Sequence, residues 1–166
     1  KISEPNKTQA HHDSHFFSAP VFNLMFRSYF LLASIGSIIG LATWLTFLFH
    51  GNALNPHGLT PMVWHAHEML FTFGATVAVG FILTAVQTWT GIESVKGLRA
   101  LYLVSLWLIT HVLFWINTSG TLTVATALQG IWWISIVYFY ARIVLHARNV
   151  RNYLFIPILT LMGLLN

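Results

Sequence analysis

The sequence predicts an all-α protein, a polytopic bundle of transmembrane helices. Hydrophobic residues make up 56% of the 166 residues, whereas charged residues make up only 7%. The mean hydropathy is +0.69, and a soluble domain usually carries about a quarter charged residues. Uncharged apolar runs of about 20 residues, the length that spans a hydrocarbon core of about 30 Å, recur along the chain. The missing charge is therefore explained by a lipid environment.

Four of these runs predict complete spans, at about 28–49, 62–89, 98–116 and 121–145. A fifth run, 153–166, is apolar and helix-like, but it rises only about 21 Å. A carboxylate terminus placed inside the bilayer would be costly. We therefore expect an incomplete fifth span in a fragment of a longer protein, with a short re-entrant or surface-lying tail as the alternative.

The part of the chain before and within the first span has its own signals. Residues 1–20 are predicted to form a polar tail, and residues 21–166 the transmembrane helical domain. The first span is too long for a signal peptide and has no small-residue cleavage site. Within it, Gly36 and Gly40 form a GxxxG pattern, which is common and suits close contact between helices.

The basic residues predict the orientation of the spans. All eight Lys and Arg fall on one side if the spans alternate, and the two loops on the other side, 50–61 and 117–121, contain none. The positive-inside rule then places the N-terminus in the cytoplasm. The sequence pI of about 9.8 accordingly reflects topology and anionic lipid headgroups, and no nucleic-acid partner is expected.

Ionisable residues at the start of the second span predict a functional site. This span is expected to begin with Thr60 as N-cap and Pro61 at the first helical position. His65 and His67 then lie roughly 6 and 9 Å below its outer end, and His111 lies roughly 8 Å below the outer end of the third span. Histidines that converge on one level inside a membrane favour a metal site over scattered core histidines.

The spacing within this cluster separates two faces of the helix. At about 100° per residue, His65 and His67 lie some 200° apart, so they can hardly bind the same ion. One helix would instead serve two sites, or one site and one hydrogen-bonding partner. Below His67, Gly74 and Ala78 leave a shallow groove beside Phe71, which suits either a flat macrocycle or a neighbouring helix.

The other face carries a polar row. Glu68, Thr72 and Thr76 follow His65 and would carry protons or water about half-way across the membrane, although threonines also bond their own helix backbone. Glu68 is a candidate proton donor, a partner that orients His65, or the counter-charge of a bound cation. The alternative is a buried, protonated acid that is hydrogen-bonded to a neighbouring helix.

Four blocks of sequence carry a resemblance to a known family. They are Phe22–Arg27, Trp64–Phe71, Gly80–Val86 and Trp89–Gly91. Their order and spacing resemble the N-terminal part of the NnrS family, and the resemblance covers most of residues 21–165. The chain has Ser28 where members often have Pro, and 87–88 differ from the Pro-Asn that members often carry. Both departures lie at the inner ends of spans, away from the histidines.

The resemblance implies a bacterial inner-membrane protein of about twelve spans that contains haem and copper and is linked to nitric oxide metabolism. It implies non-covalent, b-type haem and copper as cofactors, with His65, His67 and His111 as ligands and Glu68 as a proton source or orienting group. The chain has no cysteine, so thioether-linked haem and iron–sulfur clusters are excluded within this stretch. The implied partners are the lipid bilayer, nitric oxide, further helices beyond residue 166, and a respiratory complex or electron donor.

The resemblance leaves open whether the protein reduces nitric oxide, sequesters it, or protects other metal centres from it. Two other classes of function also remain. One is a non-enzymatic accessory subunit of a larger respiratory complex, whose histidines only form hydrogen bonds. The other is a carrier of protons or small solutes that uses Glu68.

Overall fold

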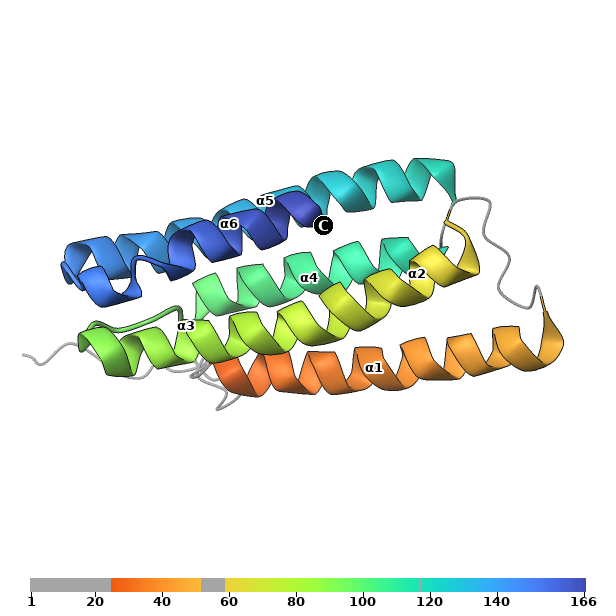
Figure 1. The fold of residues 1–166 in the computed structure, drawn as a ribbon, viewed down its shortest axis with the longest axis horizontal. Coiled ribbons are helices and arrows are strands. Elements are labelled where there is room, and N and C mark those ends of the chain that lie inside the picture. The colour runs from red at the N-terminus through yellow and green to blue at the C-terminus, as the bar shows by residue number, and fades with distance from the viewer. Residues whose placement is uncertain (1–24, 52–58, 117) are drawn as a thin grey trace, which may run out of the picture.

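A computed structural model of the chain describes residues 25–51, 59–116 and 118–166, and these residues form a bundle of helices without a strand (Figure 1). The predicted polar tail, 1–20, lies outside the described residues. The elements, in chain order, are α1 (Met25–His50), α2 (Pro61–His67), the π-helical segment η2 (Glu68–Ala75), α3 (Thr76–Thr90), α4 (Leu98–Ile116), α5 (Ser119–His146), the short 3₁₀ turn η3 (Val150–Asn152) and α6 (Phe155–Leu165).

Four helices in the described part are long and apolar enough to cross a membrane. They are α1, the continuous helix formed by α2, η2 and α3, then α4, and α5. The shorter apolar stretch Val150–Leu165 contains α6. The prediction of an all-α, membrane-spanning bundle is therefore confirmed.

Successive spans run in opposite directions, so the loops gather at two ends of the bundle (Figure 1). The start of α1, the α3–α4 loop and the α5–α6 turn lie at one end, which we call the basic end. The Lys and Arg of the described residues all lie in these segments or in the adjoining turns of α4 and α5: Arg27, Lys96, Arg99, Arg142, Arg148 and Arg151. The opposite end, where α2 begins and α4 ends, is called the distal end.

The helix that carries the histidine cluster begins where the sequence predicts. Pro61 occupies the start of α2, and Thr60 before it has the extended backbone of an N-cap residue. The Thr60 side chain makes no capping hydrogen bond, however. Proline needs no amide partner at this position and its φ is already helical, so it sets the helix start without a side-chain cap.

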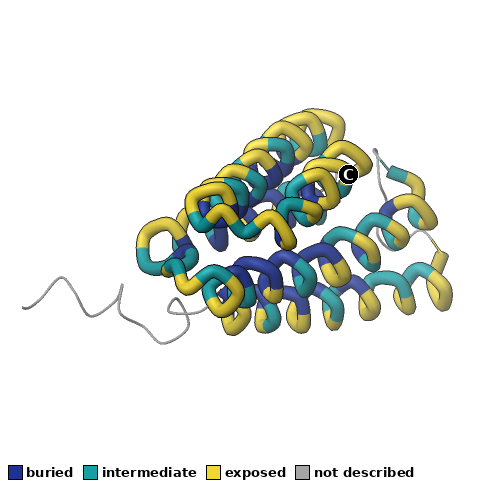
Figure 2. Tube along the Cα trace, turned by 60° about the vertical axis from the view of Figure 1, so that its left-hand side comes forward, coloured by how far each residue is buried: buried dark blue, intermediate teal, exposed yellow. Residues whose placement is uncertain are grey.

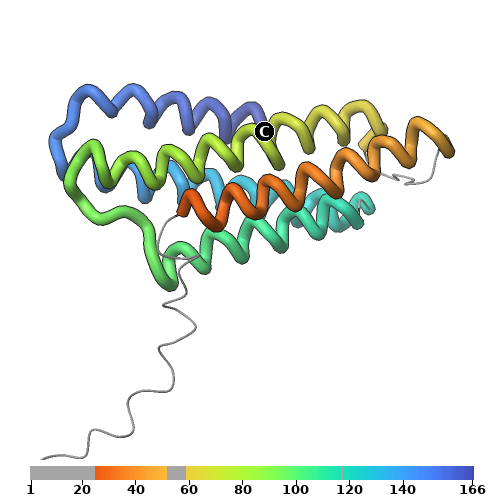
Figure 3. The backbone as a smooth tube through the Cα atoms, turned by 90° about the horizontal axis from the view of Figure 1, so that it is seen from below, coloured from red at the N-terminus to blue at the C-terminus, as the bar shows by residue number. Residues whose placement is uncertain are grey.

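The GxxxG pattern of α1 packs directly on η2. The buried residues of α1 recur at helical spacing and face η2 and α3, and Figure 3 shows these helices side by side. A Cβ atom at Gly36 would lie 2.8 Å from the Thr72 methyl group, and one at Gly40 would lie 3.6 Å from the Glu68 Cβ. The predicted close contact is confirmed, and its partner is the segment with the buried acid.

The buried residues divide into an apolar set and a polar set. Figure 2 shows that burial is concentrated on the inward-facing sides of the helices. Towards the basic end these sides are mainly apolar, although Ser28 and Asn152 are also buried there. Trp132 on α5 donates a hydrogen bond of 3.0 Å to the Tyr29 hydroxyl on α1. Towards the distal end these sides carry the buried polar residues Glu68, Thr72, Thr76, Thr110 and His111. Because buried polar groups need partners, that half of the bundle is where a site is expected.

Candidate functional site

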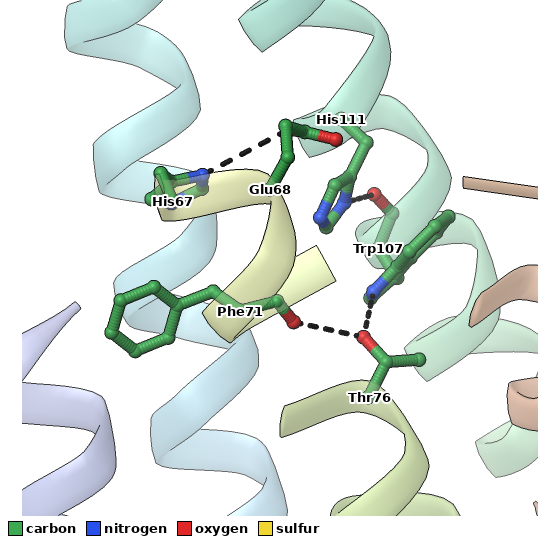
Figure 4. A network of polar contacts seen from close by, with 6 residues as sticks. All are labelled: His67, Glu68, Phe71, Thr76, Trp107 and His111. Carbon is green, nitrogen blue, oxygen red and sulfur yellow. Dashed lines mark hydrogen bonds and ion pairs between the residues drawn. The ribbon is translucent and has the colours of Figure 1, made fainter. Parts of the chain in front are cut away.

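The helix that bears the histidine cluster widens where the sequence predicts regular α-helix. Glu68–Ala75 is π-helical, so the assumption of a regular helix is wrong at this point. The Thr76 hydroxyl donates to the Phe71 carbonyl oxygen, five residues earlier, at 3.1 Å. It also accepts a bond of 2.8 Å from the Trp107 indole nitrogen on α4 (Figure 4). π-Helical turns are rare and occur frequently at functional sites.

His111 is held with one ring nitrogen bonded and the other available. Its Nδ1 atom lies 2.8 Å from the Trp107 carbonyl oxygen. A carbonyl can only accept, so Nδ1 carries the proton and Nε2 keeps its lone pair. Nε2 is buried and has no hydrogen-bond partner among the described residues. The ring stacks on that of Trp107, with 3.8 Å between centroids. Metal-binding histidines are commonly oriented by such an Nδ1–H to carbonyl bond.

His67 approaches the same region from α2. Its ring lies 4.7 Å from that of Phe114 on α4 and 5.3 Å from that of Phe71. The Nδ1 atom is 3.9 Å from the Glu68 Oε1 atom, which is an ion-pair distance but too long for a hydrogen bond. Both ring nitrogens are buried, and neither has a hydrogen-bond partner in the described part of the chain. His67 therefore also has a ring nitrogen available to bind a metal ion.

The Glu68 carboxyl group lies between these two imidazoles (Figure 4). The side chain is 1% exposed, and neither oxygen has a hydrogen-bond partner among the described residues. The sequence grouped Glu68 with His65, whereas the structure places its carboxyl beside His67. An unpartnered buried carboxyl is costly, so this position calls for a proton, a cation or a donor.

His65 belongs to a different neighbourhood. Its ring stacks on Trp44 of α1, with 4.2 Å between centroids and 9° between planes. His67 contacts α4, so the two imidazoles face different helices, as their spacing predicts. Within the described residues, no group of three or more His, Cys, Asp or Glu side chains is placed to hold one metal ion. Ligation by His65, His67 and His111 therefore stays a prediction.

The predicted groove below His67 is not covered by another described helix. Gly74 is exposed, and a Cβ atom there would meet only the Met69 carbonyl oxygen, 3.5 Å away. The small residues on this face suit either a flat macrocycle or a neighbouring helix, and among the described residues no helix packs closely on Gly74.

Three aromatic residues of the site were not anticipated from the sequence. Trp107 and Phe114 lie four residues before and three residues after His111, and such spacings place side chains on one helix face. That spacing was the signal that could have identified them. Trp44 lies on another helix from His65, and nothing in the sequence alone pairs these two residues.

The available donors fit the cofactors that the sequence resemblance implies. Imidazole nitrogen suits copper and haem iron. The buried atoms without a hydrogen-bond partner among the described residues include both ring nitrogens of His67, one ring nitrogen each of His65 and His111, and the Glu68 carboxyl oxygens. Two imidazoles do not complete a copper site, so further ligands would be needed beside His67 and His111.

Comparison with known proteins identifies one family. The family model described as NnrS protein matches residues 20–166. No curated protein and no solved structure is significantly similar to the chain.

Proposed function

Because the chain belongs to the NnrS family, it is a membrane protein of a family linked to the nitric oxide response, and we propose that it binds nitric oxide at a histidine-ligated metal centre. The observation that carries this proposal is the state of His111. Its Nδ1–H group is fixed by a carbonyl, and its Nε2 lone pair is buried and unpartnered among the described residues. A histidine that only stabilised the bundle would gain by using both nitrogens.

We assign His67 and His111 to one centre and His65 to a second centre or to a hydrogen-bonding role. His67 and His111 share the neighbourhood of Phe114, whereas His65 lies against α1. The remaining ligands come from residues outside the described part or from a partner chain. A haem iron or copper ion held by these residues would supply the binding of a small diatomic ligand.

The protein groups around this centre have separate tasks. Trp107 orients His111 and, with Phe114, covers it, so water is excluded from the centre. Glu68 holds a proton at its carboxyl group or balances the charge of the metal. Nitric oxide is small and apolar and reaches the site from the lipid, past the exposed face near Gly74. Binding alone, or reduction by electrons from a respiratory donor, are both compatible with this arrangement.

We further propose that the protein lies in the bacterial inner membrane with its basic end in the cytoplasm. The Lys and Arg of the described residues gather at that end, and the positive-inside rule assigns such an end to the cytoplasmic side. The N-terminus is then cytoplasmic, and the histidines lie in the outer half of the membrane.

A proton carrier that uses the polar row is the second candidate, since Glu68 and Thr72 are buried and unpartnered among the described residues. Thr76 ends this row, because its hydroxyl donates to Phe71 and accepts from Trp107. A hydroxyl held from both sides is poorly suited to passing protons, so we favour the metal centre.

The test is nitric oxide titration of the purified full-length protein, followed by optical spectroscopy. We expect a haem or copper spectrum that nitric oxide shifts, and loss of that shift in His67→Ala and His111→Ala. His146→Ala, an exposed histidine at the basic end, is the matched control and should keep the shift. A protein without such a spectrum, or an unchanged shift in both site variants, would contradict the proposal.

A further inference from the structure

A second polar site lies at the basic end, on the opposite side of the membrane from the histidine cluster. It is a pocket of about 300 Å³ between the α3–α4 loop, the first turn of α4 and the last turns of α5. Its polar lining includes Ser94, Arg99, Arg142 and His146, and Phe139 forms part of its apolar wall. Nothing in the proposed metal chemistry uses this pocket.

The pocket has an excess of positive charge. Its one carboxylate, Glu93, is engaged by Lys96 at 2.7 Å, which lowers the pKa of Glu93 and keeps it ionised and paired. Arg99 and Arg142 have no hydrogen-bond or ion-pair partner among the described residues. The first turn of α4 contains no acidic residue, so its free amide groups add to the positive potential. Two guanidinium groups therefore face an opening without a counter-charge.

The walls of the pocket are fixed in place by hydrogen bonds. The Ser94 amide donates to the Gln87 side chain at 3.3 Å, and the Ser94 hydroxyl donates to the Leu83 carbonyl oxygen. The α5–α6 turn is tied to the end of α3, because the Asn149 side chain donates to the Trp89 carbonyl oxygen at 3.0 Å. A loop bound in this way loses little further freedom when a ligand binds, which favours a preformed site.

The surroundings of the pocket indicate what kind of anion it binds. Arg99 lies in the first turn of α4 and Arg142 near the end of α5, so both belong to the interface level of a span. One turn further into the membrane lie Tyr102 and Tyr138, which are 45% and 56% exposed. They share helix faces with the two arginines through i,i+3 and i,i+4 spacing. Charge at headgroup depth above exposed aromatic surface matches a lipid rather than a soluble ion.

We propose that this pocket binds the phosphate group of an anionic phospholipid, whose acyl chains lie along the exposed faces of α4 and α5. Basic pockets between membrane helices on the cytoplasmic side are suited to such headgroups. Arg99 and Arg142 hold the phosphate oxygens, because guanidinium groups present paired donors to this anion. The site is independent of the metal centre and of nitric oxide.

The experiment measures lipid binding to the purified full-length protein in detergent by native mass spectrometry. Phosphatidylglycerol, phosphatidylcholine and inorganic phosphate are the three probes. We expect the wild-type protein to bind one phosphatidylglycerol in preference to phosphatidylcholine. Arg99→Gln combined with Arg142→Gln should weaken this binding about 30-fold, since each interfacial arginine contributes roughly fivefold. Arg99→Lys combined with Arg142→Lys keeps the charge but loses the paired donors, so its affinity should lie between those of the wild type and the glutamine pair.

The matched control is Arg148→Gln combined with Arg151→Gln. It removes the same charge from exposed positions at the same end, outside the pocket, and should change the affinity by less than about threefold. Equal weakening in both glutamine pairs would show only diffuse attraction to the basic end and would overturn the proposal. Unchanged binding in the Arg99 and Arg142 pair would also overturn it. Inorganic phosphate that binds as tightly as phosphatidylglycerol would overturn the assignment to a lipid.

Discussion

The contact between Gly36 and Thr72 gives the sharpest test of how α1 holds the site. In Gly36→Ala, the new methyl group would lie 2.8 Å from the Thr72 Cγ2 atom and 3.5 Å from the Trp107 Cη2 atom. Carbon atoms in contact are normally about 3.5–4.0 Å apart, so Thr72 would have to move by about 0.7 Å. Trp107 blocks one direction, because its indole is bonded to Thr76 at 2.8 Å and stacks on His111.

The neighbouring glycine of the same motif is a built-in control. In Gly40→Ala the new methyl group would lie 3.6 Å from the Glu68 Cβ atom, which is ordinary contact. Both substitutions gain up to about 1 kcal/mol of helix propensity. The difference between them therefore isolates the overpacking, which typically costs about 1–3 kcal/mol.

The assay is thermal unfolding of the full-length protein in detergent, followed by tryptophan fluorescence. With about 2–4 °C for each kcal/mol in a chain of this size, Gly36→Ala should unfold roughly 2–12 °C below Gly40→Ala. Because Thr72 belongs to η2, Gly36→Ala should also disturb the position of Glu68. Equal unfolding temperatures of the two variants, or a more stable Gly36→Ala, would refute the packing of α1 on η2.

Two further predictions concern the same contacts. In Gly80→Ala the added methyl group would lie 2.6 Å from the Tyr29 Cβ atom, which no side-chain rotation relieves, so this variant should lose about 1–3 kcal/mol. In the control Gly130→Ala the added methyl group meets nothing within 4 Å, so this variant should unfold at or above the wild-type temperature. A comparable loss of stability in Gly80→Ala and Gly130→Ala would contradict the clash with Tyr29. Trp107→Phe removes the indole donor of a 2.8 Å bond to Thr76 and should cost about 0.5–1.5 kcal/mol. In a double-mutant cycle, Thr76→Val should cost less in the Trp107→Phe background than in the wild type, and strictly additive losses would argue against the bond.

The sequence predicts much of the fold because membrane thickness and charge act on whole segments. Runs of about 20 apolar residues predict spans without any knowledge of packing, and α1, α4 and α5 are such runs. The start of α2 at Pro61 and the close contact through Gly36 and Gly40 were also predicted, since both depend on one residue type with a strong local effect.

The π-helical segment could not be predicted in the same way. A helical wheel assumes a constant turn, whereas the widening at Glu68–Ala75 is stabilised by Thr76, whose hydroxyl bonds the Phe71 carbonyl and accepts from Trp107 on another helix. Trp107, which donates this bond, lies 31 residues from Thr76 in the chain. The predicted separation of His65 from His67 is correct because both residues lie before the widened turn. The position of the Glu68 carboxyl beside His67 could not be predicted from a helical wheel.

The most direct measurement of the central claim is the metal and haem content of the full-length protein in His111→Ala. The variant should be compared with the wild type and with His146→Ala, by elemental mass spectrometry and a haem assay on the same preparations. If the buried Nε2 atom of His111 binds a metal, the His111 variant should lose copper or haem, while His146→Ala keeps the wild-type content. Identical content in all three proteins, with their helical structure intact, would contradict the assignment of His111 to a metal centre.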